Sequence, residues 1–280
     1  MNVELWASEV LAGAAGLVIG SFLNVCIYRL PQDLSLYWPP RSFCPACHRT
    51  IPAWENIPLL SWLWLRGQCA GCGSRIPLRY PLVELLTGTL FVLAVLLHGW
   101  TAEAIRLQLY ASILLVLLFT DLETRILPDE CTLGGASAGW LFALLMPQDP
   151  GLVGLCLPGG ATPAGRSLAG SLLGGLLPAA GLRLIGALYQ MIRRREGLGL
   201  GDVKMLLMVG AFAGLESTLL IVMAASLLGS LTGLVLVARR GAAATLYELP
   251  FGSFLAAAAL ALAYGPPLVR LYWGLDPVTP

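Results

Sequence analysis

The chain has 280 residues, of which 57% are hydrophobic and only 12% are charged, and its formal net charge is +1. Such a composition excludes an ordinary soluble globular protein and is typical of a chain that crosses a lipid bilayer several times. The near-neutral charge does not indicate a nucleic-acid partner, because Lys204 is the single lysine and the arginines gather between apolar runs.

The apolar runs, taken in chain order, predict eight transmembrane helices in an all-α fold. They lie near residues 6–28, 81–98, 104–120, 131–146, 167–190, 203–214, 217–237 and 250–272. A helix needs about 20 residues to cross roughly 30 Å of hydrocarbon, so the fourth and the sixth run are short on length alone. We expect the first run to be retained and not cleaved as a signal peptide, since residues 1–10 contain Glu4 and Glu9 and no basic residue.

The distribution of basic residues supports eight crossings and orients them. If every run crosses, 13 of the 17 basic residues fall on one side, namely Arg29, Arg41, Arg49, Arg66, Arg75, Arg79, Arg125, Arg193, Arg194, Arg195, Lys204, Arg239 and Arg240. Because positively charged loops remain in the cytoplasm, this side is predicted to be cytoplasmic and both termini to lie on the other side. Without the sixth run, Arg239 and Arg240 would change sides and the pattern would be lost.

The long polar segment that follows the first run, residues 29–80, contains two Cys-x-x-Cys pairs. These are Cys44 with Cys47 and Cys69 with Cys72. Each pair directs two sulfurs at one point, and two pairs complete the tetrahedral thiolate shell of a structural zinc site. A loop of this size has little core of its own, so a metal is a reasonable support. We therefore predict a cytoplasmic zinc-binding loop between the first two helices.

Other uses of these cysteines remain open. Disulfides are disfavoured because cytoplasmic thiols stay reduced. Cys44 to His48 matches the Cys-x-x-Cys-His pattern of covalent haem attachment, but the second pair lacks the histidine, and an empty redox pair is a further alternative. Cys26, Cys131 and Cys156 lie in or beside apolar runs and are expected to be buried small side chains.

Two aspartates lie where apolar runs meet water. Asp121 follows the third run, where its carboxylate faces the negative pole of the helix dipole, so stability does not account for it. Asp129 follows Pro128 and is instead expected to be the N-cap of the fourth helix. The predicted topology brings Asp121 to the same membrane face as Asp202, and two carboxylates there can share a proton and activate a water.

Asp202 belongs to the run Gly197-x-Gly199-x-Gly201-Asp202-x-Lys204. Glycines without Cβ allow a tight turn and the close approach of another backbone. The run is not a dinucleotide-binding fingerprint, because no strand precedes it. The structural alternative is that Asp202 only caps the sixth helix. With Lys204 close by, we expect Asp202 to stay ionised and Asp121 to carry the shared proton.

Four strings resemble bacterial type IV prepilin peptidases. They are GSFLNVCIYRLP at 20–31, ENIP at 55–58, RYPLVELLTG at 79–88 and GLGDVK at 199–204. Together with Asp121 and the two cysteine pairs, the similarity covers nearly the whole chain. The family consists of polytopic aspartic proteases of the inner membrane that remove the short basic leader of prepilins or type II secretion pseudopilins on the cytoplasmic side. Many members then methylate the new N-terminal residue with S-adenosylmethionine.

By motif, the resemblance implies that Asp121 and Asp202 are the catalytic pair and that Gly199, Gly201 and Lys204 form the supporting turn. It also implies that Cys44, Cys47, Cys69 and Cys72 form the cysteine cluster. Strings with Glu55 and Glu84 belong to the amino-terminal region that accompanies methyltransferase activity, without an assigned role for any residue. The implied domains are a first transmembrane helix at 1–30, the zinc loop at 31–80 and a seven-helix peptidase core at 81–280.

Two other classes of protein remain as alternatives. An ion or metal transporter could use the cysteine loop as a metal sensor, but its carboxylates are expected near the membrane midplane, in repeated halves. A noncatalytic assembly scaffold would dock partners through the loop, and it would leave Asp121 without a purpose. The sequence has no Ser-His or Cys-His arrangement for a covalent mechanism and no recognisable site for S-adenosylmethionine.

Overall fold

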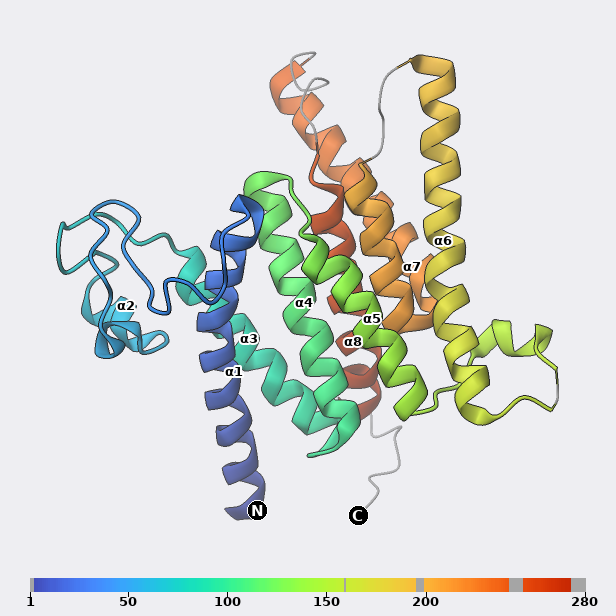
Figure 1. Ribbon diagram of the computed structural model, residues 1–280, viewed down its shortest axis with the longest axis horizontal. Helices are drawn as coiled ribbons and strands as arrows, with labels where there is room; N and C mark the ends of the chain where they lie inside the picture. Colours follow the sequence, from blue (N-terminus) through green and yellow to red (C-terminus); the bar gives the residue numbers. More distant parts are fainter. Residues whose placement is uncertain (1–2, 159, 195–198, 242–248, 273–280) are drawn as a thin grey trace. The chain divides into compact units, whose positions relative to one another are not determined.

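A computed structural model describes residues 3–158, 160–194, 199–241 and 249–272. Eight α-helices and three short 3-10 helices lie in these ranges, and the described residues contain no β-strand (Figure 1). In chain order the α-helices are α1 Val3–Arg29, α2 Leu60–Trp64, α3 Arg79–His98, α4 Ala102–Thr124, α5 Asp129–Leu145, α6 Pro163–Arg193, α7 Leu200–Arg240 and α8 Phe251–Tyr272. The 3-10 helices are η1 Leu30–Gln32, η2 Ala53–Asn56 and η3 Gly151–Cys156.

Among the described helices, six are long and apolar enough to cross a membrane, namely α1, α3, α4, α6, α7 and α8. This confirms the predicted all-α membrane fold. The run predicted at 131–146 forms α5, whose 17 residues lie at the lower limit of length for a span. The two runs predicted on either side of residue 215 are joined in α7, so the number of membrane crossings stays a prediction.

Helix α7 is two helical halves joined at a glycine. Gly214 has φ 76° and ψ 176°, a conformation that residues with a Cβ rarely adopt. The helix folds back there, and in Figure 1 both of its ends (orange) lie toward the top of the view. A straight helix of 41 residues would be about 60 Å long, about twice the thickness of the hydrocarbon layer. The reversal at Gly214 therefore agrees with the two separate runs expected from the sequence.

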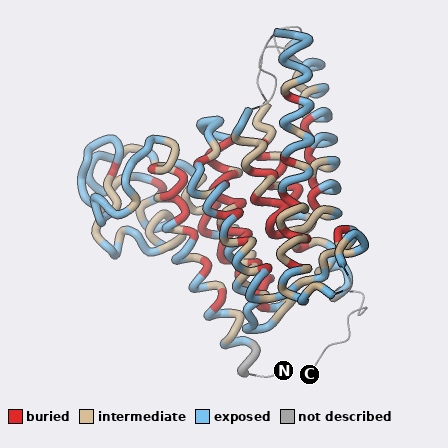
Figure 2. The backbone as a smooth tube through the Cα atoms, turned by 45° about the vertical axis from the view of Figure 1, so that its right-hand side comes forward, coloured by how far each residue is buried: buried red, intermediate tan, exposed pale blue. Residues whose placement is uncertain are grey.

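The chain divides into two compact units, which are described separately. The first contains the residues up to Val116 and those from Pro267 onward, and the second is Leu117–Pro266. Buried positions (red) alternate with exposed ones (pale blue) along the helices in Figure 2, as expected for helices with one face in a core. The sequence predicted functional domains with boundaries at residues 30 and 80. These boundaries differ from those of the compact units, and the functional division stays a prediction.

In the first unit, α1 and α3 pack backbone against backbone. A Cβ on Gly16 would lie 2.7 Å from the Cα of Gly88, and a Cβ on Gly20 would lie 2.7 Å from the Cα of Glu84. Small residues permit such close helix contacts where the lipid supplies no hydrophobic driving force. One turn beyond Gly20, the side chain of Asn24 therefore reaches the first turn of α3.

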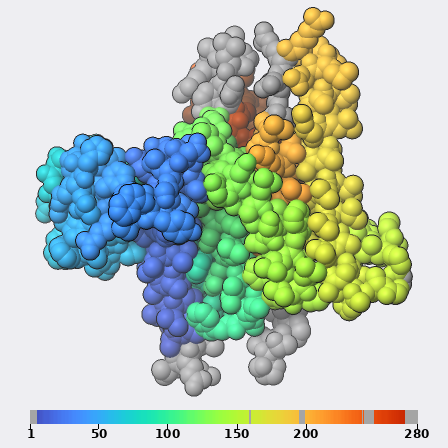
Figure 3. Space-filling model, viewed as in Figure 1, coloured from blue at the N-terminus to red at the C-terminus, as the bar shows by residue number. Residues whose placement is uncertain are grey.

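The loop residues 30–78 form a lobe beside α1 in the space-filling view (Figure 3). Arg29, 4% exposed, organises the beginning of this lobe. Its guanidinium donates hydrogen bonds to the carbonyl oxygens of Ser35, Leu36, Pro39 and Arg41 at 2.9–3.4 Å. The last basic residue of the first helix thus folds the segment that follows it.

In the second unit, α5, α6 and α7 pack through small residues. A Cβ on Gly139 of α5 would lie 2.8 Å from the side chain of Ala211 of α7, and Gly174 of α6 lies equally close to the backbone at Gly214. The hydroxyl of Ser171 donates a hydrogen bond to the carbonyl oxygen of Ala211 at 2.6 Å. Close packing around α7 holds its first half, which carries Asp202, among the neighbouring helices.

Candidate functional site

Asp121 lies in the last turn of α4, as expected, and is only 5% exposed. Its Oδ2 atom accepts two hydrogen bonds from Ser253 in the first turn of α8, one from the backbone N–H at 2.6 Å and one from the hydroxyl at 2.8 Å. Two bonds occupy both lone pairs of that oxygen. These bonds engage Oδ2 and leave Oδ1 for a water or a second carboxyl group.

Asp202 lies in the same part of the second unit as Asp121. Leu127 packs both against Gly201, which precedes Asp202, and against Gly252, which lies beside the Asp121 carboxyl group. Asp202 lies in the first turn of α7 and is half-buried. The structure thus brings together two acids that are far apart in the sequence, both at helix ends. The transporter alternative expects carboxylates in the middle of the membrane, and this placement does not support it.

Leu127, in the connection between α4 and α5, packs between two glycines near this pair. A Cβ on Gly201 would lie 3.2 Å from Leu127, and a Cβ on Gly252 would lie 3.1 Å from Leu127 and 3.2 Å from the carboxyl carbon of Asp121. A Cβ on Gly201 would therefore be tight, but the neighbour is a side chain and not the backbone that we expected. Gly199 has ordinary extended angles (φ −69°, ψ 142°), and Gly197 lies outside the described residues.

Lys204 forms an ion pair with Asp129. Its Nζ lies 2.7 Å and 2.8 Å from the two carboxylate oxygens of Asp129, so the pair joins the first turns of α7 and α5. The expectation that Lys204 keeps Asp202 ionised loses its basis, because the ammonium group is taken up by another carboxylate. The expectation that Asp129 is an N-cap is also wrong, since Pro128 holds that position and Asp129 is the first helical residue.

The structural alternative for Asp202 was a helix cap, and it does not describe α7. Gly199 is the N-cap residue, and no side chain caps the helix. Asp202 is the third residue of the helix, where the positive end of the helix dipole stabilises a negative charge. No hydrogen bond from a backbone N–H of the helix to this side chain is needed for that effect. Capping therefore does not account for Asp202.

The four cysteines of the first unit form one cluster. The sulfur atoms of Cys44, Cys47, Cys69 and Cys72 all lie within 4.8 Å of one another. The Sγ atoms of Cys44 and Cys72 are 3.9 Å apart, close to the roughly 3.8 Å expected between thiolates on one tetrahedral ion with 2.3 Å bonds. The cluster therefore fits a metal ion of the zinc class.

The two cysteine turns have the same backbone design. In each, the first cysteine N–H bonds to a carbonyl five residues on: Cys44 to Arg49 at 3.0 Å and Cys69 to Ser74 at 2.8 Å. The residue after the second cysteine has positive φ, 56° at His48 and 71° at Gly73. His48 therefore serves the turn through its backbone, which gives the haem-attachment alternative no support.

The thiols of Cys44 and Cys47 lie in the same crowded cluster but differ in pKa. Burial opposes ionisation of Cys44, but hydrogen bonds from the Cys47 backbone and the Ser74 hydroxyl outweigh it and lower the pKa of the Cys44 thiol to about 6. For Cys47, the hydrogen bond from the Arg49 backbone favours the thiolate. Desolvation and the neighbouring thiols outweigh that bond and raise the pKa of Cys47 to about 11. A cation bound to all four sulfurs would remove this competition, because each ligand would be a thiolate.

The remaining cysteines differ from one another. Cys26 is buried as expected, whereas Cys131 is half-buried and Cys156, in η3, is exposed. The expectation of burial is therefore wrong for Cys156, because the segment that carries it is a surface 3-10 helix and not part of a span.

Sequence reasoning missed Ser253, Gly252 and Leu127. No charge or spacing marks them, since Gly252 and Ser253 open an apolar run and Leu127 is one of many leucines. Their relation to Asp121 depends on where α8 begins relative to the end of α4. The two helix ends are far apart in the sequence, so no local sequence pattern predicts these contacts with Asp121.

Comparison with known proteins agrees with this geometry. Residues 14–98 match the family described as Bacterial Peptidase A24 N-terminal domain, and residues 108–234, which include Asp121 and Asp202, match the Type IV leader peptidase family. No solved structure matches the chain significantly.

Several curated relatives are similar over most of their length. Proteins named prepilin leader peptidase/N-methyltransferase are 36% identical in Aeromonas salmonicida (strain A449), with 95% of this chain and 94% of the relative covered, and 34% identical in Neisseria gonorrhoeae, with 82% and 83% covered. The relative from Stutzerimonas stutzeri is 33% identical, with 96% and 97% covered. The chain belongs to the type IV leader peptidase family.

Proposed function

We propose that this protein is a membrane aspartic endopeptidase that removes the leader peptide of type IV prepilins or type II secretion pseudopilins and then methylates the new N-terminal residue. The observation that carries the peptidase proposal is the packing of Leu127 against both Gly201, next to Asp202, and Gly252, beside the carboxyl group of Asp121. Membership of the leader peptidase family and the names of the relatives support both activities.

In the proposed cleavage step, the two carboxyl groups hold one proton and one water between them. One carboxylate accepts a proton from the water as its oxygen attacks the scissile carbonyl, and the other carboxyl group gives its proton to the leaving amine nitrogen. Ser253 holds Oδ2 of Asp121 and so turns Oδ1 toward the water. No covalent intermediate with the protein is required.

The proposed location is the bacterial inner membrane, with Asp121, Asp202 and the cysteine loop on the cytoplasmic side. The excess of arginines in the loops predicted to be cytoplasmic supports this orientation. The apolar helix of a prepilin would lie among the spans and its basic leader would stay in the cytoplasm, which brings the scissile bond to the membrane surface. We also propose the functional division into residues 1–30, 31–80 and 81–280.

Two further groups belong to the proposal. Cys44, Cys47, Cys69 and Cys72 would hold a structural zinc ion, and their sulfur spacing supports this. S-adenosylmethionine would supply the methyl group: its carbon leaves the sulfonium sulfur, which keeps the bonding electron pair, and joins the amine nitrogen, which loses a proton. The residues of this chain would orient the amine and exclude water.

The test is cleavage of a prepilin by the purified full-length protein in detergent. Asp121→Asn and Asp202→Asn should each reduce cleavage at least a thousandfold, because neither amide can transfer the proton. Glu130→Gln, an exposed acid at the start of α5, is the matched control and should cleave like the parent. Cleavage by either asparagine variant within tenfold of the parent would refute the assignment.

A further inference from the structure

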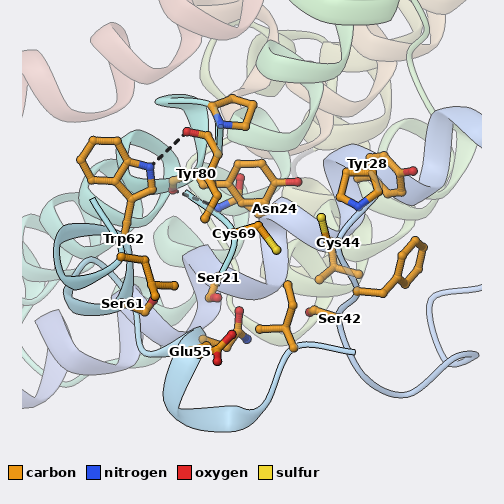
Figure 4. A pocket seen from close by; sticks show the side chains of 18 of the residues that line it. Ser21, Asn24, Tyr28, Ser42, Cys44, Glu55, Ser61, Trp62, Cys69 and Tyr80 are labelled. Atoms are coloured by element: carbon orange, nitrogen blue, oxygen red, sulfur yellow. Dashed lines mark hydrogen bonds between the residues drawn. The ribbon is translucent and has the colours of Figure 1, made fainter. Parts of the chain in front are cut away.

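A cavity lies in the first unit, between α1, the start of α3 and the loop lobe. Three strings singled out in the sequence line it together: Ser21, Asn24 and Tyr28 come from 20–31, Glu55 from 55–58, and Tyr80 and Glu84 from 79–88. Figure 4 shows all of these side chains except Glu84, which is not labelled there, around one space, with Trp62 on one wall and the sulfurs of Cys44 and Cys69 on another. The proposed peptidase site, in the second unit, uses none of these residues.

Asn24 presents an unsatisfied acceptor in this cavity. The side chain is 3% exposed, and its Oδ1 atom has no hydrogen-bond partner. Its Nδ2 donates to the carbonyl oxygens of Tyr80 at 3.0 Å and Gly20 at 3.3 Å. Because both neighbours are acceptors, the amide cannot be turned around, and Oδ1 must face the other way. A buried acceptor without a donor is costly, so this atom indicates a ligand that brings an N–H group.

Two carboxylates give the cavity affinity for a cation. Glu84 is 8% exposed, and its Oε2 accepts a hydrogen bond from the backbone N–H of Leu59 at 2.8 Å. Leu59 has φ 61°, a conformation that residues with a Cβ rarely adopt, and its N–H is held here by the glutamate. Glu55 accepts a hydrogen bond from Arg49 at 2.8 Å through one oxygen only. Since a carboxylate offers about four lone-pair sites, both acids can accept further donors.

Aromatic rings and two arginines complete the lining. Tyr28, Trp62 and Tyr80 provide rings on which a flat heterocycle can stack. Arg29 is not available to a ligand, because its guanidinium donates hydrogen bonds to four carbonyl oxygens and lies over the Phe43 ring. Arg75 lines the cavity and is exposed, so it can bind a carboxylate at the rim.

We propose that this cavity binds S-adenosylmethionine. The proposal rests on the proposed function, because that function requires a methyl donor. The donor molecule has a purine with an exocyclic N–H group, a ribose diol, a positive sulfonium with a nearby ammonium, and a carboxylate. These groups match the aromatic faces, the free Oδ1 of Asn24, the two glutamates and Arg75. The amino terminus of a peptide is a rival ligand that could bind to the two glutamates. It fits less well, because it has no purine to stack on the aromatic rings.

The cysteine cluster forms part of the proposed binding site. Cys44 and Cys69 line the cavity, and the Cys44 sulfur lies 3.6 Å from the hydroxyl of Ser74, another lining residue. A metal ion that holds the two cysteine turns together therefore also holds one wall of the cavity. Loss of the metal should open this wall and weaken donor binding.

The test measures binding of labelled S-adenosylmethionine to the full-length protein by equilibrium dialysis, together with photolabelling by the same compound and mapping of the labelled peptides. We expect Asn24→Leu and Glu84→Gln each to weaken binding at least tenfold. Label should appear within residues 20–31 or 53–84 and be displaced by S-adenosylhomocysteine. Glu103→Gln, which removes a charge from the same unit outside the cavity, is the matched control and should bind like the parent.

Prepilin cleavage on the same preparations separates the two proposals. Label that maps to residues 117–266, or equal binding by the parent and Glu84→Gln, would overturn the cavity assignment while the peptidase proposal stands. Asn24→Leu also loses the two hydrogen bonds donated by Nδ2 and could fail to fold for that reason. In that case the position of the label on the parent protein decides whether the cavity binds the donor. Asp202→Asn should bind the donor within twofold of the parent, and a parent that binds the donor but does not cleave would count against the proposed function alone.

Discussion

Ser253 donates two hydrogen bonds to a single oxygen of Asp121, through its backbone N–H at 2.6 Å and its hydroxyl at 2.8 Å. The same hydroxyl lies 3.1 Å from the carbonyl oxygen of Leu118, one turn earlier in α4. Because the hydroxyl has a single proton, it can donate to only one of these two oxygens at a time. The start of α8 thus contacts both the carboxyl group and the backbone of the helix that carries it. We regard Ser253 as a positioning residue for Asp121.

Replacement of Ser253 should impair cleavage without abolishing it. Ser253→Ala keeps the backbone donor and loses the hydroxyl, so we expect kcat to fall about tenfold, which corresponds to about 1.4 kcal/mol, with KM little changed. Ser253→Thr, which keeps the hydroxyl, should recover part of the activity. Ser226→Ala, at an exposed position of α7, is the control. An unchanged kcat in Ser253→Ala would remove the side chain from the mechanism.

The contacts of Leu127 predict the cost of adding a methyl group at the site. Gly252→Ala would place its Cβ 3.2 Å from the carboxyl carbon of Asp121, so it should displace that group and reduce cleavage at least tenfold. Gly201→Ala meets only Leu127, and the Leu127→Ala change should relieve it in the double variant.

A matched glycine change separates this effect from general sensitivity to alanine. Gly134 in α5 has nothing within 4 Å of the position that a Cβ would take, so Gly134→Ala should leave cleavage unchanged and stabilise the helix by about 0.5–1 kcal/mol. Thermal unfolding and cleavage rates measured on the parent and the glycine variants provide the comparison. A rate for Gly252→Ala equal to that of Gly134→Ala would contradict the proposed steric effect.

The Lys204–Asp129 ion pair should stabilise the junction of α5 and α7 only modestly. Both side chains are more than one third exposed, and such pairs contribute about 0–1 kcal/mol. Lys204→Met should therefore slow cleavage by less than about fivefold and leave its pH profile unchanged, since the ammonium group pairs with Asp129. The charge-exchanged double variant Lys204→Asp with Asp129→Lys should recover the loss. A shifted pH profile in Lys204→Met would show that the lysine acts on the proposed catalytic pair, Asp121 and Asp202.

Removal of a metal ion should affect the first unit more than the peptidase. Because four thiolates are required, chelation or Cys44→Ser should release one zinc ion per chain, lower the unfolding temperature and reduce methylation more than cleavage. Cys156→Ser removes an exposed cysteine outside the cluster and should retain the metal. Metal content by elemental analysis and the ratio of methylated to cleaved product are the measurements. Full metal content in Cys44→Ser would contradict the four-cysteine site.

Local patterns determined the expectations that were confirmed. The membrane fold follows from long apolar runs, because a lipid-embedded backbone must satisfy its own hydrogen bonds in helices. The cysteine cluster follows from two Cys-x-x-Cys turns, because each turn presents two sulfurs through its own short-range hydrogen bonds. The position of Asp121 in the last turn of α4 follows from the end of an apolar run.

The expectations for Lys204 and Asp129 were wrong because several partners or positions were sterically possible for each side chain. Lys204 is two residues from Asp202 in the sequence, but on a helix such neighbours point in different directions, and its ammonium group meets Asp129 of another helix. Asp129 follows a proline that itself has the extended angles of an N-cap, so the aspartate enters the helix.

The sequence by itself determined the helices, the cysteine turns and the residue types of the site, because these depend on neighbours a few positions away along the chain. Only the tertiary structure decided that Ser253 holds Asp121, that Leu127 lies between Gly201 and Gly252, and that three separate strings line one cavity around Asn24. Those contacts join residues from different helices. Their geometry depends on how closely glycine-containing helix faces approach, and no spacing within one segment specifies that distance.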